Sequence, residues 1–409
     1  MPARDFVVGL DVGTGKVAAV VAQMDQEAPN IIGVGVAANK GMRKGVVVDI
    51  EGTARAVQDA VGRAERMAGV TTRSVYLSIA GAHIASFNNR GVVAVTAEDK
   101  EITEADVQRV IEAARVFNLP SDREIIHVLP REFIVDGYDG VRDPVGMMGV
   151  RLEVEAQIVT GAVTSVQNLL KSIYKAGLEV DDVILAPLAS GESALQSAEK
   201  DLGVAIVDIG AGTTDVAIFE QGSLWYAGVV PLGGDHITSD VAVGLRTPVN
   251  QAEKIKIECG TALAEDASDD SMVSIPNMGG TGKREISERM LASIIEARTR
   301  EIFGLVANEI KKSGYPSVVP GGAVLTGGTA SMKGVLELCA RSLDMPVRLG
   351  TPRGVEGLKD IVSGPAFATA VGMVLFASRD RSRAQVMKRE TRTGGSVFGR
   401  IRNAFRELF

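Results

Sequence analysis

The chain contains the same short pattern twice, about 200 residues apart. Residues 6–21 read FVVGLDVGTGKVAAVV, and residues 204–219 read VAIVDIGAGTTDVAIF. In each copy an apolar strand ends in Asp-(Val/Ile)-Gly-x-Gly, and a second alternating apolar strand follows. Such a segment predicts a β-hairpin whose turn glycines allow positive φ angles and the close approach of a ligand. Glycine turns are common, but two copies that each end the first strand in aspartate indicate a functional pair.

Glycine turns and strand-end aspartates are suited to binding phosphate groups and a metal ion. Successive backbone N–H groups of such a turn bind phosphate oxygens. A carboxylate supplies the hard oxygen ligand that Mg²⁺ requires, usually through water. We therefore expect the two turns to hold the β- and γ-phosphates of a nucleotide from opposite sides.

The residues of this expected site come from both hairpins. The predicted phosphate-binding residues are Gly13, Thr14, Gly15, Lys16, Gly210, Gly212, Thr213 and Thr214. Asp11 and Asp208 are the predicted Mg²⁺ residues, acting through water. Lys16 would add a point charge on phosphate, and it is equally open to being a solvated hairpin lysine.

A third glycine element lies further along the chain. Residues 323–332 read AVLTGGTASM, which predicts a buried strand, a Gly-Gly turn and then a helix over 333–343. A helix N-terminus behind a glycine turn suits the α-phosphate and sugar of a nucleotide. We expect nucleoside contacts from Gly327, Gly328 and Thr329.

The last fourteen residues, SVFGRIRNAFRELF at 396–409, predict an amphipathic helix. At about 100° per residue their apolar side chains fall within roughly 140° of arc, beside a face rich in arginine. This pattern is typical of a helix that lies in a membrane interface. The predicted membrane residues are Val397, Phe398, Ile401, Arg402, Phe405, Arg406, Leu408 and Phe409. A terminal helix that packs on its own domain or on a partner protein has the same pattern and stays an alternative.

The charge distribution favours the membrane interpretation of this helix. Residues 379–395 are polar, lack apolar periodicity and end in Gly-Gly, which predicts a flexible linker. From Arg379 onward nine basic and three acidic residues give a net +6, which leaves −13 for residues 1–378 of a chain whose total is −7. Each basic residue near an anionic membrane contributes about 1 kcal/mol. We expect the tail to bind anionic lipids while the acidic body is held off the surface.

The composition excludes several other classes of protein. The two cysteines, Cys259 and Cys339, form no CxxC pair, so neither a disulfide framework nor a cysteine metal site is expected. The three histidines have no HExxH spacing, which argues against a zinc hydrolase or a Ser-His-Asp enzyme. Asp11 interrupts the apolar run near the N-terminus, and the run at 366–377 is too short to span a bilayer. We expect a cytoplasmic protein that touches the membrane only through its tail.

The three glycine motifs occur in the order DVGTGK, DIGAGTTD and LTGGTA. This order resembles the phosphate-1, phosphate-2 and adenosine motifs of the actin-like ATPase superfamily. Within it, the chain is similar over essentially its whole length to the FtsA family of bacterial cell-division proteins. The stretches that carry this resemblance lie at 31–50, 74–84, 127–137, 143–161 and 229–263 and in the C-terminus. The resemblance implies an α/β fold of the actin-like (ribonuclease H-like) two-domain ATPase type, with an inserted small 1C subdomain and a C-terminal amphipathic helix.

The resemblance and the periodicity together divide the chain into subdomains. Helices are predicted at 50–68, after a near capping box at Thr103, and at 164–176, 238–245, 250–257 and 287–312. The expected bounds are 1–83 and 163–190 for subdomain 1A, 84–162 for 1C, 191–235 and 305–378 for 2A, 236–304 for 2B, 379–395 for the flexible basic linker and 396–409 for the membrane-targeting helix.

The resemblance also implies a function. It implies an ATP-binding division protein with Mg²⁺ as cofactor, with weak or no ATP hydrolysis and no metabolic reaction. The implied partners are the tubulin-like FtsZ, whose C-terminal peptide would bind 2B, further copies of the chain through 1C, anionic inner-membrane lipids and later division proteins, but no nucleic acid. The protein would polymerise and tether the FtsZ ring to the cytoplasmic face of the bacterial inner membrane at the division site. A phosphotransferase or ATPase of the same superfamily, or a pilus-assembly-type scaffold, is the alternative.

Three further residues take their expected roles from the resemblance alone. Glu253 and Lys256 are expected near the adenine and ribose. The alternative is an ordinary i,i+3 charge pair on a solvated helix face, which has the same sequence pattern. Glu192 is a candidate catalytic residue for holding an attacking water, and pointing into solvent is its alternative.

Overall fold

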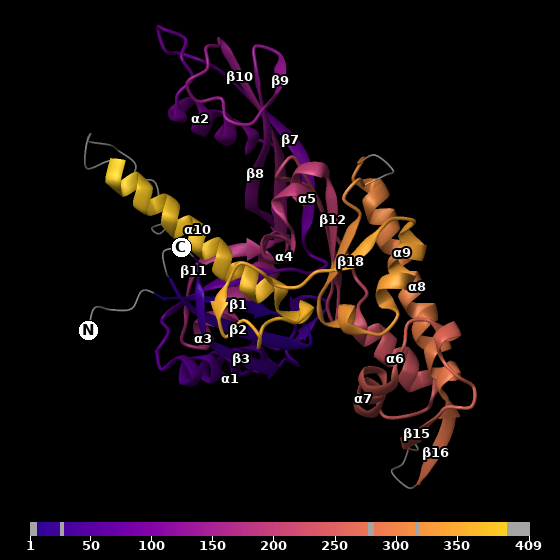
Figure 1. Cartoon of the computed structure of the whole chain (residues 1–409). Coiled ribbons are helices and arrows are strands. Elements are labelled where there is room, and N and C mark those ends of the chain that lie inside the picture. Colours follow the sequence, from indigo (N-terminus) through magenta and orange to yellow (C-terminus); the bar gives the residue numbers. More distant parts are fainter. Residues whose placement is uncertain (1–5, 25–27, 277–281, 316–318, 391–409) are drawn as a thin grey trace.

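Two large β-sheets with the same strand order form the body of the molecule (Figure 1). The computed structural model describes residues 6–24, 28–276, 282–315 and 319–390. The first sheet has the order β11-β6-β1-β2-β3-β19 and the second has the order β14-β13-β12-β17-β18. In both, three antiparallel strands are extended by two parallel strands beside the first strand of the hairpin. The chain is therefore built from two halves of the same design.

The strands of these sheets come from both halves of the sequence. The first sheet contains β1 (Phe6–Val12), β2 (Lys16–Gln23), β3 (Asn30–Ala38), β6 (Ser74–Ile79), β11 (Glu179–Leu185) and β19 (Glu356–Gly357). The second contains β12 (Val204–Ile209), β13 (Thr214–Glu220), β14 (Ser223–Val230), β17 (Ala323–Thr326) and β18 (Val347–Leu349).

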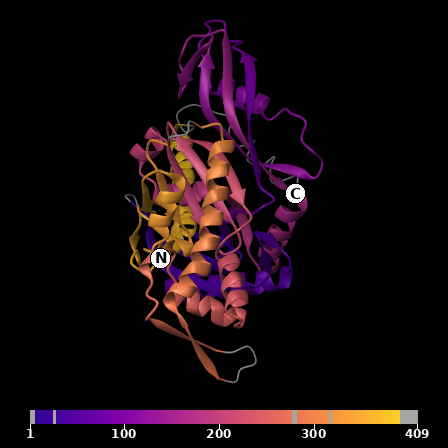
Figure 2. The same cartoon turned by 90° about the vertical axis from the view of Figure 1, so that its right-hand side faces the viewer.

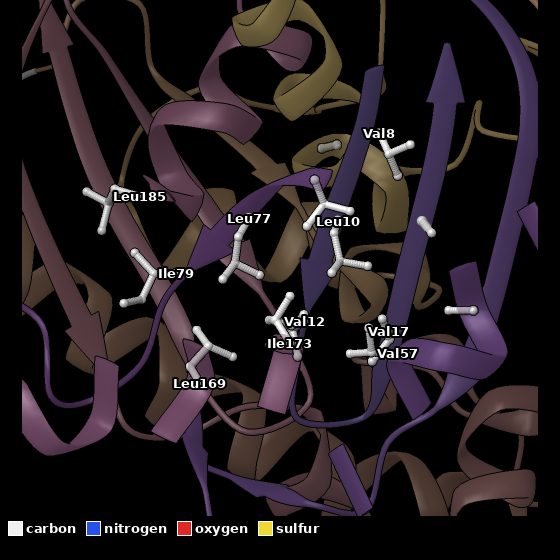
Figure 3. Packing of buried hydrophobic residues seen from close by; sticks show 14 of the residues in the cluster. Val8, Leu10, Val12, Val17, Val57, Leu77, Ile79, Leu169, Ile173 and Leu185 are labelled. Carbon is white, nitrogen blue, oxygen red and sulfur yellow. The ribbon is translucent and has the colours of Figure 1, made fainter. Parts of the chain in front are cut away.

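One face of the first sheet is covered by α1 (Ile50–Ala68) and α3 (Val163–Lys175). Figure 3 shows how Leu10 and Leu77 of the sheet pack with Val57 of α1 and Ile173 of α3 in one buried cluster. The prediction of a helix at 50–68 is confirmed, because Asp49 caps its start and Gly69, at φ 67°, ends it.

The opposite face of the first sheet is covered by α4 (Ala186–Ala194) and α10 (Ala368–Glu390). Val371 and Val374 of α10 are buried against this sheet, and β19 pairs with β3. The expected assignment of all of 305–378 to subdomain 2A is therefore wrong for the last part of that range. Small residues explain the packing, since a side chain at Gly372 would overlap the Ala189 carbonyl oxygen.

The segment after α10 also differs from the expected linker. The helix continues to Glu390, so regular structure does not end at residue 378. Residues 378–390 read SRDRSRAQVMKRE, which lacks an apolar stripe but contains no Gly or Pro. Arg, Lys, Gln, Ala, Met and Glu are all good helix formers, so a helix already started can continue through them. The expected membrane helix at 396–409 lies outside the described residues.

The second sheet is backed by the long helix α8 (Glu288–Lys312) together with α6 (Gly234–Gly244) and α9 (Val335–Leu343). The helix predicted at 287–312 is confirmed, with Ser287 as its N-cap. Helix α7 (Val249–Cys259) and the hairpin β15 (Met272–Pro276) and β16 (Lys283–Ser287) complete a lobe at the far end. The expected 2A/2B bound at 304/305 falls inside α8, which is one continuous helix.

A separate four-stranded sheet, in the order β7-β10-β8-β9, stands above both halves (Figures 1 and 2). It consists of β7 (Ala85–Ala94), β8 (Arg123–Val135), β9 (Tyr138–Val141) and β10 (Arg151–Ala162), packed on α2 (Glu104–Ala114). The predicted helix start at Thr103 is confirmed, with Thr103 and Asp106 forming a reciprocal capping box. We call residues 85–162 the inserted subdomain, because the chain leaves the first half after β6 and returns to it at α3.

Within the part of the chain that the structure describes, every helix is too short or too polar to cross a lipid bilayer.

Candidate functional site

Both predicted hairpins are present and close in the same way. Strand β1 pairs with β2, and β12 pairs with β13, each in antiparallel register. In the first turn the Gly13 amide donates to the Lys16 carbonyl at 2.9 Å, and in the second the Gly210 amide donates to the Thr213 carbonyl at 3.0 Å. The internal repeat seen in the sequence is thus a repeat of local structure.

The structure contradicts one of the two roles expected of the turn glycines, that of allowing positive φ angles. None of Gly13, Gly15, Gly210 and Gly212 has a positive φ, so the expectation of left-handed backbone was wrong. Close approach explains them instead. A side chain at Gly15 would place its Cβ 2.8 Å from the Ala211 Cβ, and one at Gly212 would lie 2.6 Å from the Thr14 Oγ1. The two turns therefore face and touch each other, as the phosphate-clamp hypothesis requires.

The two strand-end aspartates lie half-buried behind these turns, and each accepts a hydroxyl hydrogen bond. The Ser78 hydroxyl donates to Asp11 at 2.8 Å, and the Thr369 hydroxyl donates to Asp208 at 3.2 Å. Ser78 lies on β6 of the first half, whereas Thr369 lies at the start of α10. Each carboxylate is thus oriented by a neighbouring element in a matching manner.

Burial and mutual repulsion make this carboxylate group hard to ionise. Burial, together with the charge of Asp11, raises the pKa of Asp208 to about 7. Burial raises the pKa of Asp11 as well, opposed by the hydrogen bond from Ser78 and the charge of Lys16. A third carboxylate, Asp215, pairs with Asp208 in the β12–β13 register, and burial followed by repulsion from Asp208 and Asp11 raises its pKa strongly.

Lys16 is the cation that faces these aspartates. Its ammonium group donates to the Ala366 carbonyl at 2.6 Å and lies 4.6 Å from the centre of the Phe367 ring. Burial lowers the pKa of Lys16, and the charges of Asp11 and Asp208 oppose that shift. Lys16 is therefore not a solvated hairpin lysine, which removes the alternative left open by the sequence.

The residues present suit a divalent cation bound together with phosphate. Among the described residues, no three His, Cys, Asp or Glu side chains are placed to hold a metal ion by themselves. Mg²⁺ needs fewer, because it usually keeps several waters and uses one or two carboxylates plus substrate phosphates. The buried Asp215 Oδ1 has no hydrogen-bond partner, and a nearby cation would relieve the repulsion among the three carboxylates.

The other residues of the phosphate prediction line the same turns. The Thr14 hydroxyl oxygen accepts from the Gly45 amide at 3.0 Å, and the Thr214 hydroxyl donates to the Leu232 carbonyl at 2.9 Å. These two hydroxyls therefore hold the turns in shape. The Thr14 hydroxyl still has its proton to donate to a phosphate, whereas a phosphate contact from Thr214 would come from its backbone amide. Thr213 is buried in the second turn.

The predicted nucleoside residues converge beside the second turn. Gly327 has a φ of 90°, and a side chain there would overlap the Asp208 carboxylate. Gly328 begins the short helical turn η2 (Gly328–Ser331), and the Thr329 hydroxyl donates to the Gly210 carbonyl at 3.5 Å. The strand-Gly-Gly element is thus adjacent to the second hairpin, although the two are far apart in sequence.

Lys256 and Glu253 reach this place from α7. The Lys256 ammonium group donates to the Gly234 carbonyl at 3.1 Å and forms an ion pair with Glu253 at 2.6 Å. Lys256 is only 7% exposed, so the alternative of a charge pair on a solvated helix face is wrong for it. A side chain at Gly234 would lie 2.7 Å from the Thr329 Oγ1, which connects Lys256 to the glycine element.

Glu192 lies in different surroundings. Its carboxylate is mostly buried and forms ion pairs with Lys200, at 3.1 Å, and with Arg379 of α10. Both carboxylate oxygens of Glu192 are thus engaged in ion pairs, Oε2 with Lys200 and Oε1 with Arg379. The alternative of pointing into solvent is wrong too, and the catalytic interpretation gains no support from these contacts.

Three residues of this site were not predicted from the sequence. Ser78 and Thr369 orient the aspartates, but one lies at the end of an apolar strand and the other in an apolar run, where nothing marks them as polar partners. Asp215 belongs to the DIGAGTTD motif itself. In a β-hairpin with this turn, Asp215 must lie opposite Asp208. Of the three residues, it is therefore the one that could have been predicted from the sequence.

Solved structures with similar folds bind nucleotides or assemble with partners. A chain of a PilM–PilN type IV pilus biogenesis complex aligns with a TM-score of 0.68 at 16% identity, covering 92% of this chain and 99% of its own. MreB5 of Spiroplasma citri bound to ADP aligns with a TM-score of 0.58 at 15% identity, covering 94% of this chain and 99% of its own. At such low identity these likenesses establish the fold, which is actin-like, and nothing more.

Sequence comparison is more specific. The family model described as "Cell division protein FtsA" matches residues 205–372, and that described as "SHS2 domain inserted in FTSA" matches residues 81–160. The cell division protein FtsA of Pseudomonas aeruginosa is 44% identical, covering 92% of this chain and 90% of its own. Those of Neisseria meningitidis and Escherichia coli are 41% and 37% identical, and each covers 99% of both chains. The chain belongs to the FtsA family of cell-division proteins.

Proposed function

We propose that the chain is an ATP-binding, actin-like division protein that self-associates and tethers the FtsZ ring to the inner membrane through its C-terminal helix. The observation that carries the nucleotide part is the meeting of two glycine turns over the half-buried Asp11, Asp208 and Lys16. The shared fold of MreB5 bound to ADP and to AMPPNP supports an adenine nucleotide as the ligand. Membership of the FtsA family supports the role in division.

The backbone amides and charged side chains of the site suit the binding of a nucleoside triphosphate. Backbone amides of the two turns would hold the β- and γ-phosphates, with Lys16 leaving the Ala366 carbonyl to contact phosphate. Asp11 and Asp208 would hold a hydrated Mg²⁺, which when bound supplies positive charge beside the phosphates. The Lys256–Glu253 pair, Gly327 and Thr329 would surround the nucleoside on the side of the second half. We expect weak ATP hydrolysis, because the carboxylate of Glu192 pairs with Lys200 and Arg379.

Assembly and membrane binding would reinforce each other. One fourteen-residue amphipathic helix gives modest, reversible membrane affinity. A filament displays many such tails, so its membrane affinity should rise steeply with its length. In this proposal the lobe of α6, α7, β15 and β16 receives the C-terminal peptide of FtsZ, and the inserted subdomain takes part in self-association.

Three measurements on the purified full-length chain test the proposal. Labelled ATP should bind in the presence of Mg²⁺, anionic vesicles should sediment the protein, and FtsZ should be retained in a pull-down. Removing residues 396–409 should abolish sedimentation with vesicles and leave ATP and FtsZ binding unchanged. Failure to bind ATP would contradict the nucleotide part. Rapid transfer of phosphate to a small molecule would favour the phosphotransferase alternative.

A further inference from the structure

The inserted subdomain contacts both halves of the body. Toward the first half, the Leu185 amide donates to the His127 Nε2 at 3.0 Å, and Arg123 donates to the His83 carbonyl at 3.0 Å. Toward the second half, the Ser86 hydroxyl donates to the Ala227 carbonyl at 2.6 Å. Figures 1 and 2 show β7 and β8 descending to the junction between the halves. The subdomain is covalently joined to the first half alone, so its attachment to the second half is noncovalent.

A stacked pair forms the centre of this noncovalent attachment. The Arg131 guanidinium of β8 lies 3.5 Å from the centre of the Trp225 ring on β14. The Arg131 side chain is only 9% exposed, and its nearest carboxylate, that of Glu155 on β10, is 3.9 Å away. A small hollow lies around the pair, lined also by Glu132, Glu220 and Ser223. A long cationic side chain is thus held mostly out of water, with an aromatic face as its closest partner.

Trp225 is fixed from the side of the second half. Its indole N–H donates to the Ser313 carbonyl at 3.2 Å, and its ring meets the edge of Tyr315 at a centroid distance of 5.6 Å. The Tyr315 hydroxyl in turn donates to Glu220 at 2.9 Å. The tryptophan therefore moves with the second half, and Arg131 moves with the inserted subdomain.

A change in the separation of the halves would act on this junction. The two glycine turns touch each other, so a phosphate chain held by amides of both acts directly on the spacing between the halves. A change in that spacing carries Trp225 relative to Arg131, because only the second half holds the indole. A single cation–π contact of moderate burial shifts an equilibrium about 2- to 30-fold, which is weak enough for a ligand to overcome.

We propose that the Arg131–Trp225 stack is a releasable contact that sets the position of the inserted subdomain according to the spacing of the two halves. Arg131 is then a positioning residue for self-association and touches no nucleotide. The inference rests on the proposed function, because nucleotide binding supplies the change in spacing and self-association is what the inserted subdomain controls.

Trp225 is the only tryptophan of the chain, so its fluorescence reports this contact directly. In the full-length wild type, adding Mg·ATP should change the Trp225 emission and its quenching by acrylamide. Arg131→Gln should expose the indole, with red-shifted emission and stronger quenching before nucleotide is added. The nucleotide-dependent change should be lost. Because the nucleotide no longer has to break the stack, the affinity for labelled ATP should rise, by up to the same 2- to 30-fold. Arg131→Lys keeps a cation over the ring and should restore most of the response.

Two further variants keep the result interpretable. Arg115→Gln removes an arginine whose ion pair, with Glu112 at 3.5 Å, lies within the inserted subdomain, and it should behave as wild type. Ser86→Ala weakens the neighbouring contact to Ala227 and should shift the fluorescence in the same direction as Arg131→Gln, to a smaller extent. Thermal unfolding of each variant checks that it is folded, and Ser86→Ala decides the matter if Arg131→Gln does not fold.

The outcomes separate this inference from the proposed function. If Arg131→Gln and Arg115→Gln give the same emission and quenching, or if the nucleotide response survives in Arg131→Gln, the releasable contact is refuted. If the wild type binds ATP but Trp225 does not respond, the inference fails and the nucleotide proposal stands. If the wild type binds no ATP at all, the proposed function fails first.

Discussion

At the scale of single residues, the three aspartates behind the glycine turns define the chemistry of the candidate site. Asp215 is buried, while Asp11 and Asp208 are half-buried. The charge of Asp11 raises the pKa of Asp208, and the charges of both raise the pKa of Asp215. Buried carboxylates without enough counter-charge are destabilising, and the cluster has Lys16 as its neighbouring cation. A divalent cation bound with phosphate would supply the missing charge. Binding of such a ligand would therefore offset the free-energy cost of holding these carboxylates together.

Asp208→Ala should weaken the binding of Mg·ATP by at least about tenfold, since each factor of ten corresponds to about 1.4 kcal/mol. The fold should survive, because losing one of three mutually repelling carboxylates relieves repulsion. Titration with labelled ATP measures the effect, with and without Mg²⁺. Asp360→Ala, at an exposed position, is the matched control. Affinity equal to that of the control would remove Asp208 from the site.

The same carboxylate predicts a pH dependence of stability in the metal-free, nucleotide-free protein. The pKa of Asp208 is about 7 when folded, against 3.8 as its ordinary value. Between these pH values the folded state holds a proton that the unfolded state has lost, so stability should fall as pH rises through this window. Asp208→Asn should therefore raise the melting temperature relative to wild type at about pH 8 and not at about pH 4. An equal change in melting temperature at both pH values would contradict the raised pKa of Asp208.

At the scale of elements, local signals predicted most of what the structure contains. Both hairpins, the α1 helix and the capping box at Thr103 follow from short stretches of sequence, because their stabilising contacts are local. The approach of the two glycine turns was also predictable from their duplication. The features that could not be predicted depend on contacts between residues far apart in the sequence. The packing of α10 on the first sheet is one case, and the hydroxyl of Thr369 on Asp208 is another.

Helix α10 provides an element-scale test, because two helical glycines have opposite surroundings. A side chain at Gly372 of α10 would overlap the Ala189 carbonyl of α4, whereas one at Gly304 of α8 would meet nothing within 4 Å. Gly372→Ala should destabilise the protein by about 1–3 kcal/mol or more through overpacking. Gly304→Ala should stabilise it by about 0.5–1 kcal/mol through helix propensity. Thermal melting distinguishes the two, and shifts of the same sign would show that α4 and α10 are not in close contact.

At the scale of the whole molecule, the inserted subdomain has the topology of a removable part. Its first and last strands are neighbours, with Ala85 opposite Thr160 in the β7–β10 register. Replacing residues 84–160 by a short Gly-Ser link should therefore leave a soluble body that binds ATP and no longer self-associates normally. Sedimentation and ATP titration of this variant measure both properties. Loss of ATP binding would show that the subdomain is integral to the nucleotide site.

The net charge of the whole molecule is unevenly distributed between its body and its C-terminal segment. Residues 1–378 carry a net −13, while the remainder of the chain carries +6. An acidic body avoids an anionic membrane, and a basic terminal segment is drawn to it. The membrane proposal therefore depends on the tail alone, and within the tail it depends on whether the apolar or the basic face dominates.

The apolar face should dominate. Full burial of a side chain such as Phe405 contributes about 1.5–3 kcal/mol, and less at a shallow interface. Phe405→Glu places a charge in the middle of that face and should release the protein from anionic vesicles. Arg402→Gln should weaken binding less, and mainly at low salt, because exposed charges are screened over about 8–10 Å. Co-sedimentation across a salt series measures both variants. If Phe405→Glu sediments as the wild type does, the tail is no membrane anchor, and a docking helix for a protein partner becomes the better interpretation of its amphipathic pattern.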